Sequence, residues 1–171
     1  MEHLITIEEL SQYTRKMYPD EDLIPAYIDE AEQIDIKKNI GDELFINLID
    51  NKDEKYETLL EGGEYTTKCG NTKIFKGLKC ALSYYVYARI VQFGSEIQTR
   101  FGFVGKDDEY STKVDSKNRY IASNEARNIA NQYLSECLEY IQNTPDVFPN
   151  KKCCGSRRKG LGRMKVRSIG D

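Results

Sequence analysis

The sequence lacks several features on which many enzymes depend. Its 171 residues include one histidine, His3, near a chain end that we expect to fray, so histidine-based catalysis has little to work with. We expect this histidine to be an exposed polar residue. No glycine-rich segment has the spacing or the preceding strand of a phosphate-binding loop. The sequence contains no internal repeat and no low-complexity tract, which argues against repeat architectures.

Cysteines are few and irregularly placed. The five form an odd-numbered set without regular spacing, which predicts free thiols rather than a disulfide framework. Cys80 and Cys137 lie on apolar faces of expected helices and are interpreted as core residues. The adjacent Cys153 and Cys154 lack the paired spacing that zinc sites use. We therefore expect neither a metal nor a cofactor.

Signals for secretion or membrane insertion are also missing. The first ten residues, MEHLITIEEL, are acidic and contain no long apolar run, so we expect synthesis in the cytoplasm. The most apolar stretch, within Lys76–Thr99, is too short and too often charged to span a bilayer. With 39% apolar and 31% charged residues, the composition is that of a soluble protein, long enough for one domain with extensions.

Carboxylates are abundant, and one cluster stands out. Asp107, Asp108 and Glu109 follow one another in a long segment without helical period. Grouped carboxylates bind magnesium or exchange protons in some sites. Because this and the other acidic clusters lack a defining spacing, we interpret them as solvated helix faces or loop tips.

Charge is distributed unevenly along the chain. Residues 151–171 hold eight of the 25 basic residues and one of the 28 acidic ones, which leaves 17 basic and 27 acidic residues, a net charge of −10, in residues 1–150. The basic positions, which we predict to dock a partner, are Lys151, Lys152, Arg157, Arg158, Lys159, Arg163, Lys165 and Arg167. Three roles are open for such a tail: it docks on a protein, binds the phosphates of a nucleic acid, or only solubilises the chain. Docking on a protein fits the loose alternation of apolar residues with charges, at Leu161, Met164, Val166 and Ile169.

Apolar periodicity predicts a mainly α fold, a helical bundle around a central aromatic-rich helix within Lys76–Thr99. We expect other helices from an N-cap at Thr6 to about Lys16, from Asp20 or Asp22 to about Ile40, from Asp42 through Ile49, at Glu54–Glu61, and at Lys117–Asn143 with Ser116 or Ser123 as its cap. Glu64–Phe75 is predicted to be a small hairpin or an irregular loop. Arg100–Lys117 is predicted to be a long loop or a second hairpin with its tip near Gly105–Asp108. The helical domain spans residues 1–145, and an extended basic tail, mobile or ordered only by a partner, spans 146–171.

The order of these elements resembles a known class of virion proteins. An acidic opening, ITIEELSQY, leads into LIPAYIDEAEQIDIKKNIGDELFINLID, and an aromatic central helix, LKCALSYYVYARIVQ, precedes a polar loop and a closing amphipathic helix at Ser123–Ile141. This layout, over roughly residues 4–143, resembles the head–tail connector (adaptor) proteins of tailed bacteriophages and, in local phrasing, the ring proteins of crAss-like phages.

The resemblance implies a structural subunit of the virion without catalytic residues. About twelve copies would form a ring at the head–tail interface, beneath the portal protein and next to further connector or tail proteins. DNA would pass through this ring without sequence-specific contact, and no membrane would be involved. Candidate subunit-contact residues lie in the two predicted loops: Cys69, Gly70, Asn71, Phe101, Phe103, Lys106, Asp107 and Asp108.

Two other functions stay open at this point. In the first, the acidic body of a DNA-binding regulator or packaging factor dimerises while the basic tail grips phosphates. In the second, a metal-dependent phosphoesterase uses Asp107, Asp108 and other carboxylates.

Overall fold

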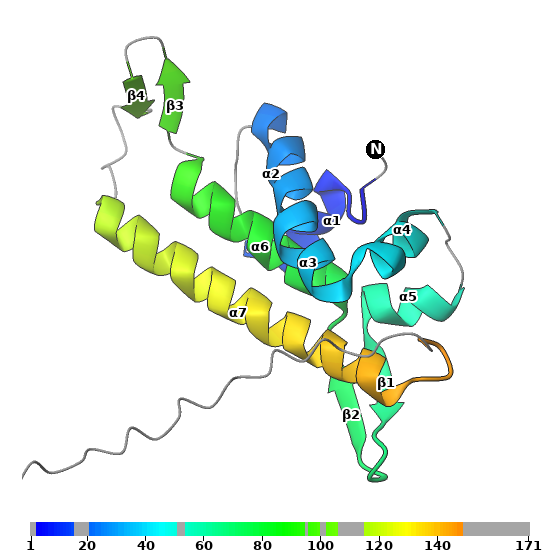
Figure 1. The fold of residues 1–171 in the computed structure, drawn as a ribbon. Helices are drawn as coiled ribbons and strands as arrows, with labels where there is room; N and C mark the ends of the chain where they lie inside the picture. Colours follow the sequence, from blue (N-terminus) through cyan, green and yellow to red (C-terminus); the bar gives the residue numbers. More distant parts are fainter. Residues whose placement is uncertain are drawn as a thin grey trace, which may run out of the picture.

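A computed structural model of the protein describes residues 3–15, 21–50, 54–94, 96–99, 102–105 and 115–148 (Figure 1). The fold is mainly α, as the periodicity predicts. The helices are α1 (Ile7–Tyr13), α2 (Ile24–Glu30), α3 (Lys37–Ile40), α4 (Asp42–Asp50), α5 (Glu54–Glu61), α6 (Leu78–Phe93) and α7 (Ser116–Asn143). The strands are β1 (Gly63–Thr66), β2 (Thr72–Phe75), β3 (Glu96–Thr99) and β4 (Gly102–Gly105).

Helix α1 begins at the predicted cap. Thr6 Oγ1 accepts a hydrogen bond from the backbone N–H of Glu9, and Glu9 Oε2 accepts one from the N–H of Thr6, which together form a capping box. The helix ends at Tyr13, short of the predicted end, because Thr14 adopts an extended backbone.

The second predicted helix is interrupted rather than continuous. A 3₁₀ turn at Glu21–Leu23 precedes α2, and a π-helical segment at Ala31–Ile36 separates α2 from α3. Gly41, with φ of +81°, ends α3 as expected, and α4 begins at the next residue.

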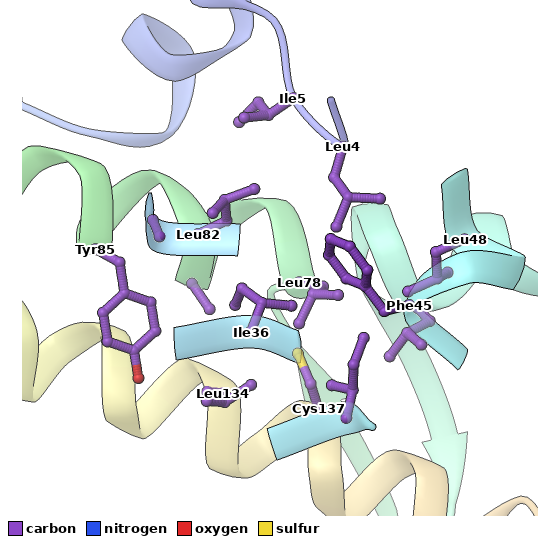
Figure 2. Packing of buried hydrophobic residues seen from close by; sticks show 14 of the residues in the cluster. Leu4, Ile5, Ile36, Phe45, Leu48, Leu78, Leu82, Tyr85, Leu134 and Cys137 are labelled. Atoms are coloured by element: carbon purple, nitrogen blue, oxygen red, sulfur yellow. The ribbon is translucent and has the colours of Figure 1, made fainter. Parts of the chain in front are cut away.

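Helix α6 is the central element. Figure 2 shows its Leu78 and Leu82 between side chains of the N-terminal helices, such as Ile36 and Phe45, and Leu134 of α7. Most of its circumference is buried, so a nearly all-apolar helix is the sequence that this position requires. The prediction was wrong beyond Phe93, because Glu96–Thr99 pairs as strand β3 with β4 instead of extending the helix.

Helix α7 runs antiparallel to α6 (Figure 1). Its predicted caps were wrong. Asp115 occupies the N-cap position without a side-chain cap bond, and Ser116 is the first helical residue. Ser123 is buried, and its hydroxyl donates to the carbonyl oxygen of Ala88 at 2.9 Å. Ile121, which the apolar pattern of this helix would place on the buried face, is exposed.

The first candidate hairpin region contains an antiparallel strand pair, whereas the second, Arg100–Lys117, contains only β4, whose partner β3 precedes the predicted segment. β1 and β2 pair from Gly63 opposite Phe75 to Thr66 opposite Thr72, within the predicted segment. β3 and β4 pair from Glu96 opposite Gly105 to Thr99 opposite Gly102. Because Gly105 is paired with Glu96 inside this ladder, the predicted tip near Gly105–Asp108 was wrong.

Two glycines fix where the β1–β2 hairpin joins the helices. Gly62, between α5 and β1, and Gly77, between β2 and α6, have φ of +92° and +82°. A Cβ on Gly77 would lie 2.4 Å from Gly62 N and Leu60 O, so the two junctions pass in direct backbone contact. The hairpin is therefore held rigidly at its base.

The packed body continues past the last helix. Phe148 is buried and its ring lies 5.9 Å from that of Tyr140 and 6.2 Å from that of Tyr56. Val147 packs against the same core. The tail predicted from residue 146 thus begins inside the core, and its remainder, 149–171, lies outside the described residues.

Candidate interaction surfaces

The β1–β2 tip presents three of the predicted contact residues. Cys69, Gly70 and Asn71 are all exposed, at the end of the hairpin that projects from the body (Figure 1). Thr67 shapes the turn: its N–H donates to Asn71 O at 2.8 Å, and its hydroxyl oxygen accepts from Asn71 N–H at 3.1 Å. The tip is therefore ordered by its own hydrogen bonds before any partner arrives.

The two faces of this hairpin differ in burial. Tyr65 and Phe75 point inward, where their rings pack on Tyr140 of α7 at 5.3 and 4.6 Å. Lys73 Nζ, on the same face, lies 2.5 Å from Glu139 Oε1. On the outer face, Ile74 is 69% exposed, which is the largest exposure of a bulky hydrophobic side chain in the described residues.

The opposite end of α6 carries the second hairpin. Phe103 lies in β4, opposite Gln98, whereas Phe101, Lys106, Asp107 and Asp108 lie outside the described residues. At the adjoining helix ends, three further bulky side chains are exposed on α6 and α7: Phe93, Tyr120 and Ile121. This end of the helix pair therefore offers a second apolar surface.

Sequence reasoning missed a charged network that joins α1, α5 and α6. Lys79 Nζ lies 2.6 Å from Glu9 Oε1 and 2.5 Å from Glu61 Oε1, and Tyr13 donates its hydroxyl proton to Glu61 Oε2 at 2.6 Å. Burial opposes ionisation of both glutamates, but the hydrogen bonds and charge of Lys79, with bonds from neighbouring groups, outweigh it and lower their pKa values. Burial and the hydrogen bond to Glu61 raise the pKa of Tyr13 to about 12.

His3 is not the free polar residue that we expected. Its Nδ1 lies 3.0 Å from Oε2 of Glu32, and Oε1 of that carboxylate accepts the N–H of Leu4 at 2.7 Å. Glu32 lies in the π-helical segment and is buried, so for this residue the interpretation of acidic clusters as solvated helix faces or loop tips was wrong. The carboxylate fastens the N-terminal segment onto the helices.

A second buried network surrounds Arg89 of α6. Its Nη2 lies 2.7 Å from Asp35 Oδ2, its Nε 3.3 Å from Glu30 Oε2, and its Nη1 donates to the carbonyl oxygen of Tyr85 at 3.2 Å. The arginine side chain is 5% exposed, Asp35 is 16% exposed and Glu30 is 53% exposed. This network is a structural connection between α6 and the α2 region rather than an open site.

A cavity of about 640 Å³ opens beside the Lys79 network. Its walls come from residues 3–9, α2, α4 and α5, with Lys79 from α6. Sequence patterns gave no indication of it, since its wall combines short elements from separate parts of the first half of the chain.

The described part of the chain contains no group of three or more His, Cys, Asp and Glu side chains able to hold a metal ion. Cys80 and Cys137 are buried, as predicted, and burial raises the pKa of Cys137 to about 12. Cys153, Cys154, Glu109 and all eight basic tail residues lie outside the described residues. Among the described helices, none has the length and hydropathy that a membrane crossing requires.

Comparison with known proteins adds one assignment. No curated protein and no solved structure matches the chain. The profile of a family of unknown function, DUF6712, matches residues 36–160, from the end of the π-helical segment into the basic tail. That match covers more than half of the sequence, and the chain therefore belongs to the DUF6712 family.

Proposed function

We propose that this protein is a structural subunit of a phage virion, a head–tail connector that assembles as a ring beneath the portal and continues the DNA channel. The proposal rests on the resemblance in element order together with one structural observation. Two antiparallel hairpins leave the helical body at opposite ends of α6, β1–β2 before it and β3–β4 after it (Figure 1).

Two different surfaces at opposite ends suit a ring. A closed ring needs heterologous contacts, in which one surface of each subunit meets a different surface of the next. The ordered β1–β2 hairpin, with the exposed Ile74, provides one such surface. The exposed apolar side chains near β3–β4 provide a second. In this proposal the two hairpins make the side-to-side contacts, and the body has no enzymatic activity.

Charge supports the channel role. A net charge of −10 on residues 1–150 repels DNA phosphates, so passing DNA would not be retained by the wall. The basic residues 151–171 would dock on the portal or an adjacent ring protein, at the head–tail interface of the virion.

Mass photometry of the full chain, alone and with the portal complex of its phage, tests the proposal. We expect discrete ring species of about twelve copies, at least in the presence of the portal. Ile74→Asp should abolish them, whereas Ile46→Asp, at an α4 position that is 53% exposed, should leave them intact. Equal loss in both variants would contradict the assignment of the contact to the hairpin.

The role of the tail is tested by a version ending at Asn150, which keeps the buried Phe148. It should assemble with itself but dock more weakly on the portal. A monomer in all conditions, with tight DNA binding that falls steeply with salt, would instead indicate the DNA-binding alternative.

A further inference from the structure

The cavity beside Lys79 has an apolar floor. Leu4, Ile5, Ile28 and Leu48 are buried core residues that line it, together with Tyr56. Its volume of about 640 Å³ lies in the range of sites that enclose a drug-sized ligand or a few side chains of a peptide. An apolar floor open to solvent favours an occupant with apolar side chains.

The rim of the cavity is acidic. Glu9, Glu57 and Glu61 line it with Lys79 as the opposing cation, so the carboxylates outnumber the lysine by two. Because Lys79 is already bound by Glu9 and Glu61, it leaves no free positive charge at the rim. The occupant best suited to this cavity therefore has apolar side chains flanked by basic ones.

The chain itself carries such a segment. From Met164 to Arg167, apolar and basic residues alternate, as MKVR, with Leu161 and Ile169 on either side. In an extended chain, alternate residues point to opposite sides, so Met164 and Val166 can face the floor while Lys165 and Arg167 reach the rim. Leu161 and Ile169 fall on the same side of the extended segment as the two basic residues.

The tail also starts near the cavity. The last described residue, Phe148, does not line the cavity, but its ring lies 6.2 Å from that of Tyr56, which does. From Phe148 to Leu161 a fully extended chain spans about 40 Å. This is long enough for the alternating segment to reach the cavity wall near Tyr56. A tether of this length gives an effective concentration on the order of millimolar, well above that of another copy in dilute solution.

We propose that residues 161–169 of this protein dock in the cavity of the same molecule. Apolar side chains such as Met164 and Val166 then cover the floor, and Lys165 and Arg167 pair with the acidic rim. This intramolecular contact goes beyond the proposed connector role and does not depend on it. It gives the tail a resting site from which a partner must displace it.

Photocrosslinking in the full-length protein tests this docking. Val166 is replaced by the photoreactive amino acid p-benzoylphenylalanine, and Ser156, in a part of the tail without apolar residues, serves as the matched labelling control. At low protein concentration, we expect the label at 166 to give crosslinks within single chains, mapped by mass spectrometry to residues 3–9, α4 and α5. The label at 156 should give few crosslinks to these segments.

Charge reversal at the rim provides the second arm. Glu57→Lys, at an exposed rim position outside the Lys79 network, should lower the crosslink yield about three- to tenfold, and 1 M salt should act in the same direction. Glu43→Lys, at an exposed α4 position that does not line the cavity, should leave the yield unchanged.

Three outcomes would overturn the proposal: crosslinks confined to covalent dimers, crosslinks spread evenly over the surface from both labels, or equal yields in the two charge variants. Since the readout comes from monomers, failure of ring assembly would not affect it.

Discussion

The buried Arg89 network gives a stability prediction of definite size. Arg89→Met keeps most of the side-chain stem but leaves the Asp35 carboxylate, 16% exposed, without its partner at 2.7 Å. Removing one partner of a buried ion pair costs about 3–5 kcal/mol, and the partial exposure of Asp35 places the expected loss near the lower end, at about 3 kcal/mol. For a chain of this size, a loss of about 3 kcal/mol lowers Tm by roughly 6–12 °C.

Urea denaturation followed by circular dichroism measures the loss, with Glu30→Gln as the matched control. Glu30 is 53% exposed and its oxygen lies 3.3 Å from the same arginine, so this change should cost less than about 1 kcal/mol. Combining Arg89→Met with Asp35→Asn should recover part of the loss, because the unpaired charge is then gone. If Arg89→Met costs no more than Glu30→Gln, the network does not hold α6 to the α2 region as argued.

Three further predictions concern separate parts of the molecule. Gly77→Ala should destabilise the protein by about 2–4 kcal/mol, against about 1–2 kcal/mol for Gly70→Ala. Both glycines have positive φ, but only at Gly77 would an added Cβ meet backbone atoms. Similar losses of unfolding free energy in urea melts of the two variants would contradict the close approach at the hairpin base. Lys79→Met should flatten the pH dependence of stability, because Glu9 and Glu61, which bind this lysine, have pKa values below their ordinary 4.5. In the wild type, the stability that these ionised glutamates contribute is fully present above about pH 4.5 and is lost as the pH falls through the lowered pKa values. Acid titration of unfolding should therefore show a shallower loss of stability in the variant. Cys69 should react with iodoacetamide at pH 8 much faster than Cys137, which is buried with a pKa of about 12, and peptide mass spectrometry that found equal labelling would contradict the packing of α7.

Local signals were sufficient to predict several elements from the sequence. The capping box at Thr6 and Glu9 involves side chains three residues apart, so its pattern is visible without any tertiary context. The bounds of α5 match the prediction because Gly62 ends the helix at a position that needs positive φ. The central helix and the closing amphipathic helix were both visible as long apolar patterns, and in the structure α7 packs against α6.

The errors arise where distant contacts decide the structure. The π-helical segment keeps an apolar spacing close to that of an α-helix, so periodicity alone did not reveal the change. Ile97 in strand β3 follows Phe93 of α6 at a helical step of four residues, but β3 is defined by its partner β4. Phe148 follows the helix-stopping Pro145, and its burial depends on Tyr56 and Tyr140. Tyr56 is far from Phe148 in sequence, and the end of α7 lies between Tyr140 and Phe148.

The polar positions of α6 carry a further signal. Lys79 and Arg89 are the two basic residues in a mostly apolar helix, and both form ion pairs in the structure. A buried charged group requires a partner, so these two positions predict that carboxylates from other elements converge on α6. The sequence does not say which carboxylates, because that choice depends on the tertiary arrangement.

The rigid base of the β1–β2 hairpin bears on how an assembly contact through it would form. Gly62 and Gly77 lock its root, ring stacking on Tyr140 fixes its inner face, and hydrogen bonds within the turn order its tip. A contact made by such an element requires little ordering on binding, so most of the free energy from burying Ile74 would remain as affinity. A tail docked in its own cavity must first be displaced, which weakens its binding to any partner by the free energy of that docking. The hairpin is therefore suited to a constitutive subunit contact, and the tail to a contact that forms only when a partner competes successfully for it.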